Sequence, residues 1–195
     1  MSPPASLASI RRLARRFRRS RRGSTIVEFA LVAPLFFALL FAIIETALVF
    51  YASQVLETIT QDSARAVFTG QAQSGQVPLC QAGGQPAPCT QAGFASYVCQ
   101  QVPALFNCNN IYIDVRSYPG FSNVTMSSQI DAAGNFINNM QYNPGGSCSI
   151  VVVRLFYQWP LIVTGLGYNI SNLTGNKRLL AATAAFRNEP YNGSC

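Results

Sequence analysis

The hydrophobic residues near the start of the chain form one uninterrupted run. Phe29 to Ile44 contains no charged residue, and residues 26–52 predict a single apolar helix. At a rise of 1.5 Å per residue this helix spans roughly 40 Å, enough to cross a hydrocarbon core of about 30 Å. Pro34 lies inside it, and membrane helices tolerate proline because neighbouring groups satisfy the freed carbonyl. The run therefore predicts a membrane-spanning helix, with Tyr51 as an aromatic residue at the interface.

Beyond the apolar run, the hydrophobic pattern becomes amphipathic. Apolar residues recur at intervals of three or four positions, while polar residues line another face, so we expect the helix to continue to about Gly70. The apolar positions are Leu48, Ala52, Val55, Ile59 and Ala66. One long helix results, with a lipid-facing first half and a second half that faces a protein core.

Three later segments are predicted to be strands. Residues 111–118 alternate between apolar and polar positions, and residues 149–159 (SIVVVRLFYQW) are β-branched and aromatic. Residues 177–187 (KRLLAATAAFR) have helix-forming composition, but we predict a strand because this short segment closes the chain and has a strand to pair with. Residues 94–106 predict a short helix, with one face made by Tyr97, Val98, Val102 and Leu105.

The segments between these elements are predicted to be loops. Residues 70–93 are rich in Gly, Gln, Pro and Ala, and residues 119–148 are rich in Asn, Ser and Gly, with room for a short strand or one turn of helix. Residues 161–175 predict a loop with apolar contacts. The fold class is therefore α+β, in which the long N-terminal helix packs on a small antiparallel sheet.

The charge of the chain is concentrated in one segment. The net charge is +7, but eight of the 14 basic residues are arginines between positions 11 and 22, which leaves six basic against seven acidic residues elsewhere. A short arginine run can bind nucleic acid or flank a membrane segment, and the adjacent apolar run favours the membrane. We predict a basic cytoplasmic leader at 1–23, a transmembrane helix at 24–52 and an extracytoplasmic domain at 53–195, with no nucleic-acid partner.

Six cysteines follow the apolar run, namely Cys80, Cys89, Cys99, Cys108, Cys148 and Cys195. An even number on one side of a membrane segment predicts three disulfides in an oxidising compartment. Local closure favours the pairs Cys80–Cys89 and Cys99–Cys108 and leaves Cys148–Cys195. Six cysteines allow other connectivities, and the sequence does not select one.

The composition argues against an enzyme. The chain contains no histidine, which excludes Ser–His and Cys–His pairs, and no C-x-x-C pair that would suggest a zinc site. The seven acidic residues include two in the membrane segment, so few carboxylates remain for a catalytic pair. Phosphate loops and dinucleotide fingerprints are missing from the sequence. We therefore expect no catalytic residue, no cofactor and no metal.

Glu28 and Glu45 are the acidic residues of the apolar helix. They are separated by about 26 Å along the axis, which places them near opposite boundaries of the hydrocarbon. Glu45 is interpreted as a wetted residue at the outer boundary. Glu28 has two interpretations: it reaches the inner interface, or it requires a nearby cation. A cut between Gly23 and Ser24 would supply that cation as the new amino group of Ser24, in the same helix or in a staggered neighbour.

The segment from Arg22 to Phe29 (RGSTIVEF) resembles the processing site of a type IV prepilin. It has a glycine, a carboxylate five residues later, an aromatic residue and then an apolar helix. The Glu-Phe pair and the long basic leader resemble the Tad/Flp branch, and the long downstream domain resembles TadE-like pseudopilins. Residues 157–160 (YQWP) and 181–190 (AATAAFRNEP) resemble the middle strand and the C-terminal ending of that family.

This resemblance implies a pilin-like α+β domain with disulfide-tied loops. It implies cleavage of Gly23–Ser24 by a membrane prepilin peptidase, with Glu28 and Phe29 needed for maturation or assembly. The implied role is a minor pilin or pseudopilin that integrates into or primes a Tad (type IVb) pilus, or a related secretion machine, used for adhesion. Its implied partners are other pilins and the Tad assembly machinery.

The implied location is the bacterial inner membrane, crossed once, with a cytoplasmic N-terminus and a periplasmic C-terminal domain. In the assembled pilus, the domain would lie at the cell surface. One alternative is an unprocessed, signal-anchored periplasmic binding or adhesion module in which Glu28 has no special role. A second alternative, a periplasmic enzyme, would require catalytic carboxylates in the loops.

Overall fold

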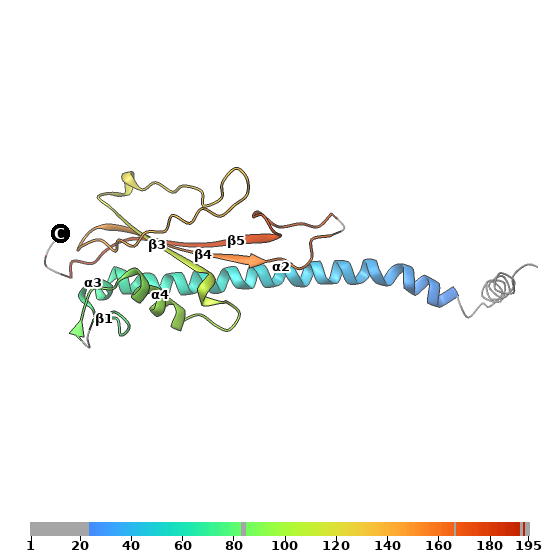
Figure 1. Cartoon of the computed structure of the whole chain (residues 1–195), viewed down its shortest axis with the longest axis horizontal. Helices are drawn as coiled ribbons and strands as arrows, with labels where there is room; N and C mark the ends of the chain where they lie inside the picture. The colour runs from blue at the N-terminus through green and yellow to red at the C-terminus, as the bar shows by residue number, and fades with distance from the viewer. Residues whose placement is uncertain (1–23, 83–84, 166, 192, 194–195) are drawn as a thin grey trace, which may run out of the picture. The chain divides into compact units, whose positions relative to one another are not determined.

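The computed structural model describes residues 24–82, 85–165, 167–191 and 193. The chain divides into two compact units between Ile44 and Glu45. Helix α2, Ser24–Phe68, contributes to both units, and all the other described helices and strands belong to the second unit (Figure 1). The fold class is α+β, as the sequence predicts.

The second half of α2 is amphipathic, as the sequence predicts, but its buried stripe differs from the predicted one, because Leu48 is exposed and Val55 is only partly buried. One stripe of the helix is buried, at intervals of three or four residues, and consists of Val49, Ala52, Leu56, Ile59, Ser63 and Val67. The exposed face carries Gln54, Thr58, Gln61 and Arg65. The helix ends at Phe68, and Gly70 follows with a φ of 77°, in the left-handed region where glycine commonly terminates helices.

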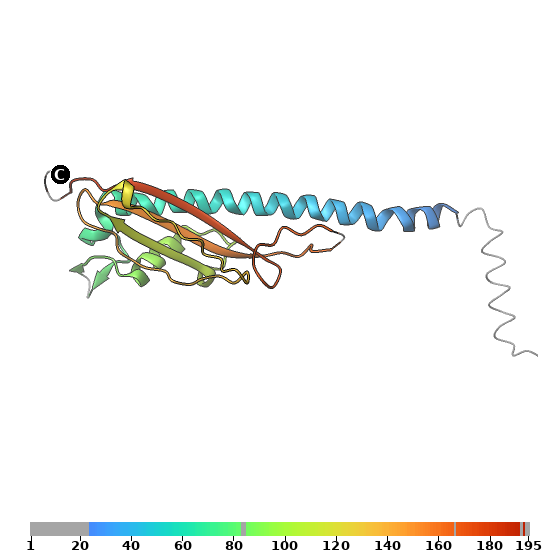
Figure 2. The same ribbon diagram turned by 90° about the horizontal axis from the view of Figure 1, so that it is seen from above.

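Three antiparallel strands form the main sheet, in the order β3-β4-β5 (Figure 2). The strands are β3 (Ile111–Tyr118), β4 (Ile150–Pro160) and β5 (Lys177–Arg187). β3 and β5 have the predicted bounds, whereas β4 is shifted by one residue from 149–159. Val153 of the central strand pairs with Val115 on one side and with Ala184 on the other.

One face of the sheet forms the hydrophobic core with α2. Successive side chains of a strand point to opposite faces, so alternate residues of β4 enter this core. These residues are Val151, Val153, Leu155 and Tyr157. Helix α4, Gln91–Gln100, adds Phe94 and Val98 to the same cluster. The packing of the long helix on the small sheet confirms the predicted architecture.

The other face of the sheet is covered by the segment between β3 and β4 (Figure 1), and a buried ion cluster holds the two together. Asp114 of β3 is fully buried, and its Oδ2 accepts bonds from Arg154 Nη2 at 2.6 Å and from Arg116 Nε at 2.9 Å. Its Oδ1 accepts from the backbone N–H of Gln141 at 2.8 Å. Arg154 also donates to the carbonyl of Ser127 at 3.4 Å. Charge-assisted bonds of this kind fix geometry more strongly than neutral ones.

The covering segment, predicted to be mostly loop, contains little regular structure. It has one turn of 3-10 helix, η3 (Phe121–Asn123), and an isolated bridge between Ile130 and Phe136. The ring of Phe136 packs against Tyr112 of β3, at 4.6 Å between ring centroids. Asp131 closes the intervening turn by accepting from the backbone N–H of Asn135 at 2.7 Å, a bond that lowers the pKa of its carboxyl group.

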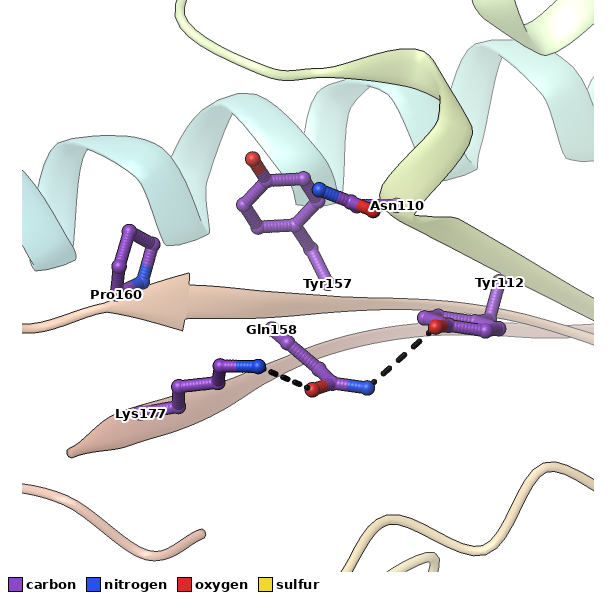
Figure 3. Close-up of a pocket in the computed structure, with 6 residues that line it drawn as sticks. All are labelled: Asn110, Tyr112, Tyr157, Gln158, Pro160 and Lys177. Carbon is purple, nitrogen blue, oxygen red and sulfur yellow. Dashed lines mark hydrogen bonds between the residues drawn. The ribbon is translucent and has the colours of Figure 1, made fainter. Parts of the chain in front are cut away.

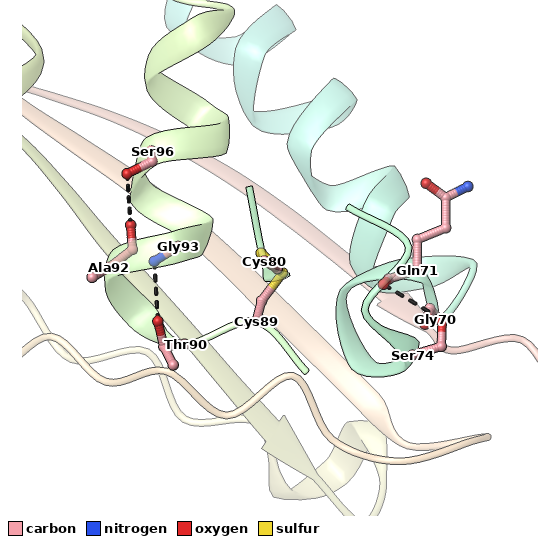
Figure 4. Close-up of a disulfide and its surroundings, with 9 residues drawn as sticks. All are labelled: Gly70, Gln71, Ser74, Cys80, Cys89, Thr90, Ala92, Gly93 and Ser96. Carbon is pink, nitrogen blue, oxygen red and sulfur yellow. Dashed lines mark hydrogen bonds between the residues drawn. A yellow bond between two sulfur atoms is a disulfide. The ribbon is translucent and has the colours of Figure 1, made fainter. Parts of the chain in front are cut away.

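The region predicted to be a loop at 70–93 contains three short elements. They are α3 (Gln71–Ser74), β1 (Gln81–Ala82) and β2 (Gln85–Pro86), and the two strands pair with each other. The disulfide Cys80–Cys89 closes this region beside the first turn of α4 (Figure 4). The cross-link limits the freedom of a glycine-rich segment that has few apolar residues of its own.

A second disulfide, Cys99–Cys108, joins the end of α4 to the 3-10 turn η2 (Cys108–Asn110) that precedes β3. These two bridges are the local closures that the sequence favours. Cys148 is not a free thiol. Its predicted partner, Cys195, lies outside the described residues, so the pairing Cys148–Cys195 stays a prediction.

The predicted bounds of the short helix, 94–106, are wrong at both ends. α4 begins earlier because Thr90 caps it: the hydroxyl of Thr90 accepts from the backbone N–H of Gly93 at 3.1 Å. α4 ends at Gln100 because Pro103 disfavours helical geometry in the residue before it. Leu105, expected on the buried face, is exposed.

We expect Asp114→Ala to lower the free energy of unfolding by about 3–5 kcal/mol, because the buried guanidinium of Arg154 would lose its counter-charge. Arg116→Ala is the matched control. Its side chain is partly exposed, so its loss should cost only about 1 kcal/mol. Urea titration in detergent micelles, followed by the fluorescence of Trp159, measures both values. Equal losses would contradict a central role for the buried pair.

Candidate assembly site

The first half of α2 presents apolar side chains on every side. Its exposed large hydrophobic residues are Ile26, Val27, Phe29, Leu31, Val32, Leu35, Phe36, Phe37, Leu39, Leu40, Phe41, Ile43 and Ile44. Among the described residues, the helix from Thr25 to Phe68 is the one that is long and apolar enough to cross a membrane. A helix that is hydrophobic all round requires an apolar environment, either lipid or other helices.

Glu28 is the one charged residue between Ser24 and Ile44. It lies one helical turn after Ser24, and residues at positions i and i+4 share a face. Phe29, directly after it, is exposed. Gly23, the other half of the predicted cleavage site, lies outside the described residues.

The interpretation of Glu45 as a wetted boundary residue is wrong. Its side chain is only 6% exposed. Oε1 accepts from the backbone N–H of Ile162 at 2.5 Å, and Oε2 accepts from that of Val163 at 3.1 Å. Because these donors lie far away in the sequence, the helical pattern contains no signal for them. Glu45 thus binds the segment between β4 and β5 to the helix. The described part of this segment, residues 161–165 and 167–176, is here called the β4–β5 loop.

The β4–β5 loop is held at several other points. The hydroxyl groups of Thr46 and Tyr168 form a hydrogen bond beside the Glu45 contact. At the base of the loop, the N–H of Leu161 donates to the carbonyl of Asn176 at 2.9 Å. Arg178 of β5 donates to the carbonyl of Ile170 at 2.8 Å. The loop is therefore fixed both to the helix and to the sheet.

A polar pocket lies at the end of the sheet where β4 stops and β5 begins (Figure 3). It is lined by Asn110, Tyr112, Tyr157, Gln158, Pro160 and Lys177. The amide of Gln158 lies between Lys177 Nζ and the hydroxyl of Tyr112, at 3.5 Å from each. Lys177 is the one charged residue of the lining.

Residues 23–65 of the chain match the family model described as TadE-like protein. The matched segment begins at the glycine of the predicted processing site and includes Glu28, Glu45 and most of the amphipathic half of α2. The predicted resemblance to TadE-like chains is thereby confirmed for this segment. The curated proteins and the solved structures contain no match to the chain.

We expect Glu45→Ala to free the first residues of the β4–β5 loop, because two backbone N–H groups would lose their acceptor, at a cost of about 1–3 kcal/mol. Hydrogen exchange measures the result: the amides of Ile162 and Val163 should exchange much faster than in the parent chain. Glu57→Ala, which removes a carboxylate elsewhere on α2, should leave these amides protected. Unchanged protection in Glu45→Ala would contradict the role of Glu45 as the anchor of the loop.

Proposed function

We propose that this chain is a minor pilin or pseudopilin that integrates into or primes a Tad (type IVb) pilus or a related secretion machine. The observation that carries the proposal is the family match over residues 23–65, because it falls on the prepilin-like motif and on the long helix. Its partners are then other pilins, the Tad assembly machinery and a prepilin peptidase.

The exposed surface of α2 supports this role. Before assembly, an apolar helix of this length is stable in the bacterial inner membrane, with the domain that follows on the periplasmic side. During assembly, the same surface packs against the helices of neighbouring subunits, which replace lipid as its apolar environment. The disulfide-tied domain, displayed outside the helices, then contributes to adhesion.

Glu28 has a specific part in the proposed assembly. A carboxylate near the centre of a bilayer costs about 2.5–3.5 kcal/mol, and less near its edge, so a neutralising cation is favoured. Peptidase cleavage after Gly23 creates one at the amino group of Ser24. If parallel helices are staggered axially, the carboxylate of one subunit meets the amino group of the next, and burial makes any other stagger costly.

The alternative function, an unprocessed signal-anchored binding or adhesion module, uses the same helix only as a tether. It requires neither cleavage nor a role for Glu28. The two functions therefore differ in the mature N-terminus and in the effect of removing one carboxylate, and each difference can be measured.

We expect the membrane-extracted protein to begin at Ser24 when the cells contain an active prepilin peptidase. Intact-mass measurement and N-terminal sequencing determine this. The control is the same chain in cells that lack the peptidase, where residues 1–23 should remain attached. Retention of Met1 in peptidase-positive cells would favour the signal-anchored module.

We expect Glu28→Ala and Glu28→Gln to abolish incorporation of the subunit into sheared pili, because both remove the charge that pairs with the Ser24 amine. The outer domain should still fold and keep its disulfides, since Glu28 lies outside the second compact unit. Glu57→Ala is the control, because it removes a carboxylate from the same helix beyond the apolar segment. Immunoblotting of pili and membranes measures the distribution, and normal incorporation of Glu28→Gln would contradict the charge pairing.

A further inference from the structure

The β4–β5 loop contains an isoleucine that is almost fully exposed although the backbone beside it is fixed. The side chain of Ile162 is 90% exposed, while its own N–H is bonded to Glu45 and the N–H of Leu161 is bonded to Asn176. An exposed apolar side chain on a mobile loop needs no explanation. Ile162 is different, because four bonds near it hold the loop in one position.

The exposed surface of α2 indicates where the membrane ends within the second unit. Leu48, Phe50 and Tyr51 are exposed and apolar or aromatic, and the exposed polar residues begin at Gln54. Aromatic residues such as Tyr51 mark the membrane–water interface. The outer boundary of the bilayer therefore lies near Tyr51 on this helix.

The loop reaches the helix below that boundary. Glu45, which binds the N–H groups of Ile162 and Val163, precedes Tyr51 by about 9 Å along the helix axis. Residues 160–176 contain no charged residue, so no charge has to be taken out of water when the loop approaches lipid. An uncharged loop is thus fixed at the depth of the lipid interface.

We propose that the β4–β5 loop is a second membrane contact of this chain and that Ile162 inserts into the outer boundary of the bilayer beside α2. The bonds to Glu45 make this insertion possible, because non-helical backbone at membrane depth requires its N–H groups to be satisfied within the protein. The same bonds supply hydrogen-bond donors to the carboxylate of Glu45. We choose lipid as the occupant of this surface because Ile162 is bonded to Glu45, which is close in the sequence to the exposed apolar residue Leu48. This contact depends on the proposed function, in which the helix spans the membrane before the pilus is assembled.

Such a contact would orient the domain on the membrane before assembly. The helix alone fixes the depth of the chain but leaves the domain free to rotate about the helix axis. A loop that enters the lipid on one side of α2 removes that freedom and presents a defined face of the domain along the membrane. Extraction into a pilus then has to withdraw the loop as well as the helix.

The test uses the full chain in phosphatidylcholine vesicles with tryptophan as the probe. The natural tryptophan, Trp159, is replaced by phenylalanine, and single tryptophans are introduced by Ile162→Trp, Phe37→Trp and Phe121→Trp. Ile162 and Phe121 are both exposed, so neither substitution disturbs the core. Phe37 reports on the membrane segment, and Phe121 reports on a part of the domain that should stay in water.

Quenching by lipids brominated on the acyl chains is compared with quenching by aqueous acrylamide. We expect tryptophan at 162 to lose most of its emission to bromine placed near the headgroups and to emit at shorter wavelength than tryptophan at 121. Tryptophan at 121 should be quenched by acrylamide alone, and tryptophan at 37 by bromine placed deep in the chains.

The outcomes separate the loop contact from the membrane helix. If the tryptophan at 37 is quenched by brominated lipid and the one at 162 only by acrylamide, the loop contact is overturned while the helix remains in the membrane. Shielding of position 162 from both quenchers would mean that a second copy of the chain covers it, which also overturns a lipid contact. If position 37 is not quenched by brominated lipid, the membrane stage of the proposed function fails as well.

Discussion

The apolar surface of α2 is the constraint on which the rest of the structure depends. Over its second half, a stripe that includes Val49, Leu56 and Val67 is covered by the sheet and by α4. Over its first half, up to Ile44, the apolar side chains are exposed on all sides. A surface of that size is unstable in water and marks contact with a membrane or with other proteins. One helix therefore accounts both for the folding of the domain and for its need of an external apolar environment.

The two faces of the sheet are held by different interactions. The face toward α2 is apolar, and its buried side chains belong to the hydrophobic core. The opposite face depends on the buried Asp114 and two arginines. Arg154 donates to the carbonyl of Ser127, and Asp114 accepts from the N–H of Gln141, in directional, partly buried bonds. These bonds keep a long segment with little regular structure in one position.

The sequence predicts those helices and strands whose pattern of apolar and polar residues lies within the element itself. Residues 111–118 alternate between apolar and polar positions, and α2 remains one helix through the change from exposed apolar residues to core-facing residues. For residues 177–187, pairing with β4 overrides the helix-forming composition, and that outcome was predictable because a β-branched partner precedes them. The motif from Gly23 to Phe29 is equally local. The role of Glu45 could not be predicted, because its donors are backbone groups that only the tertiary fold brings to it.

Glu28 and Glu45 lie on the same helix, but they differ in the groups that compensate their charge. If the helix spans a membrane as proposed, both lie toward the ends of the hydrocarbon, where an ionised group requires compensation. Glu45 receives that compensation from N–H groups of its own domain, so it joins the domain to the helix and does not depend on assembly. In the proposed pilus, Glu28 receives it from the amine of another subunit. In that proposal, the pairing between subunits sets the stagger between neighbouring helices, and a single acidic residue is sufficient for it.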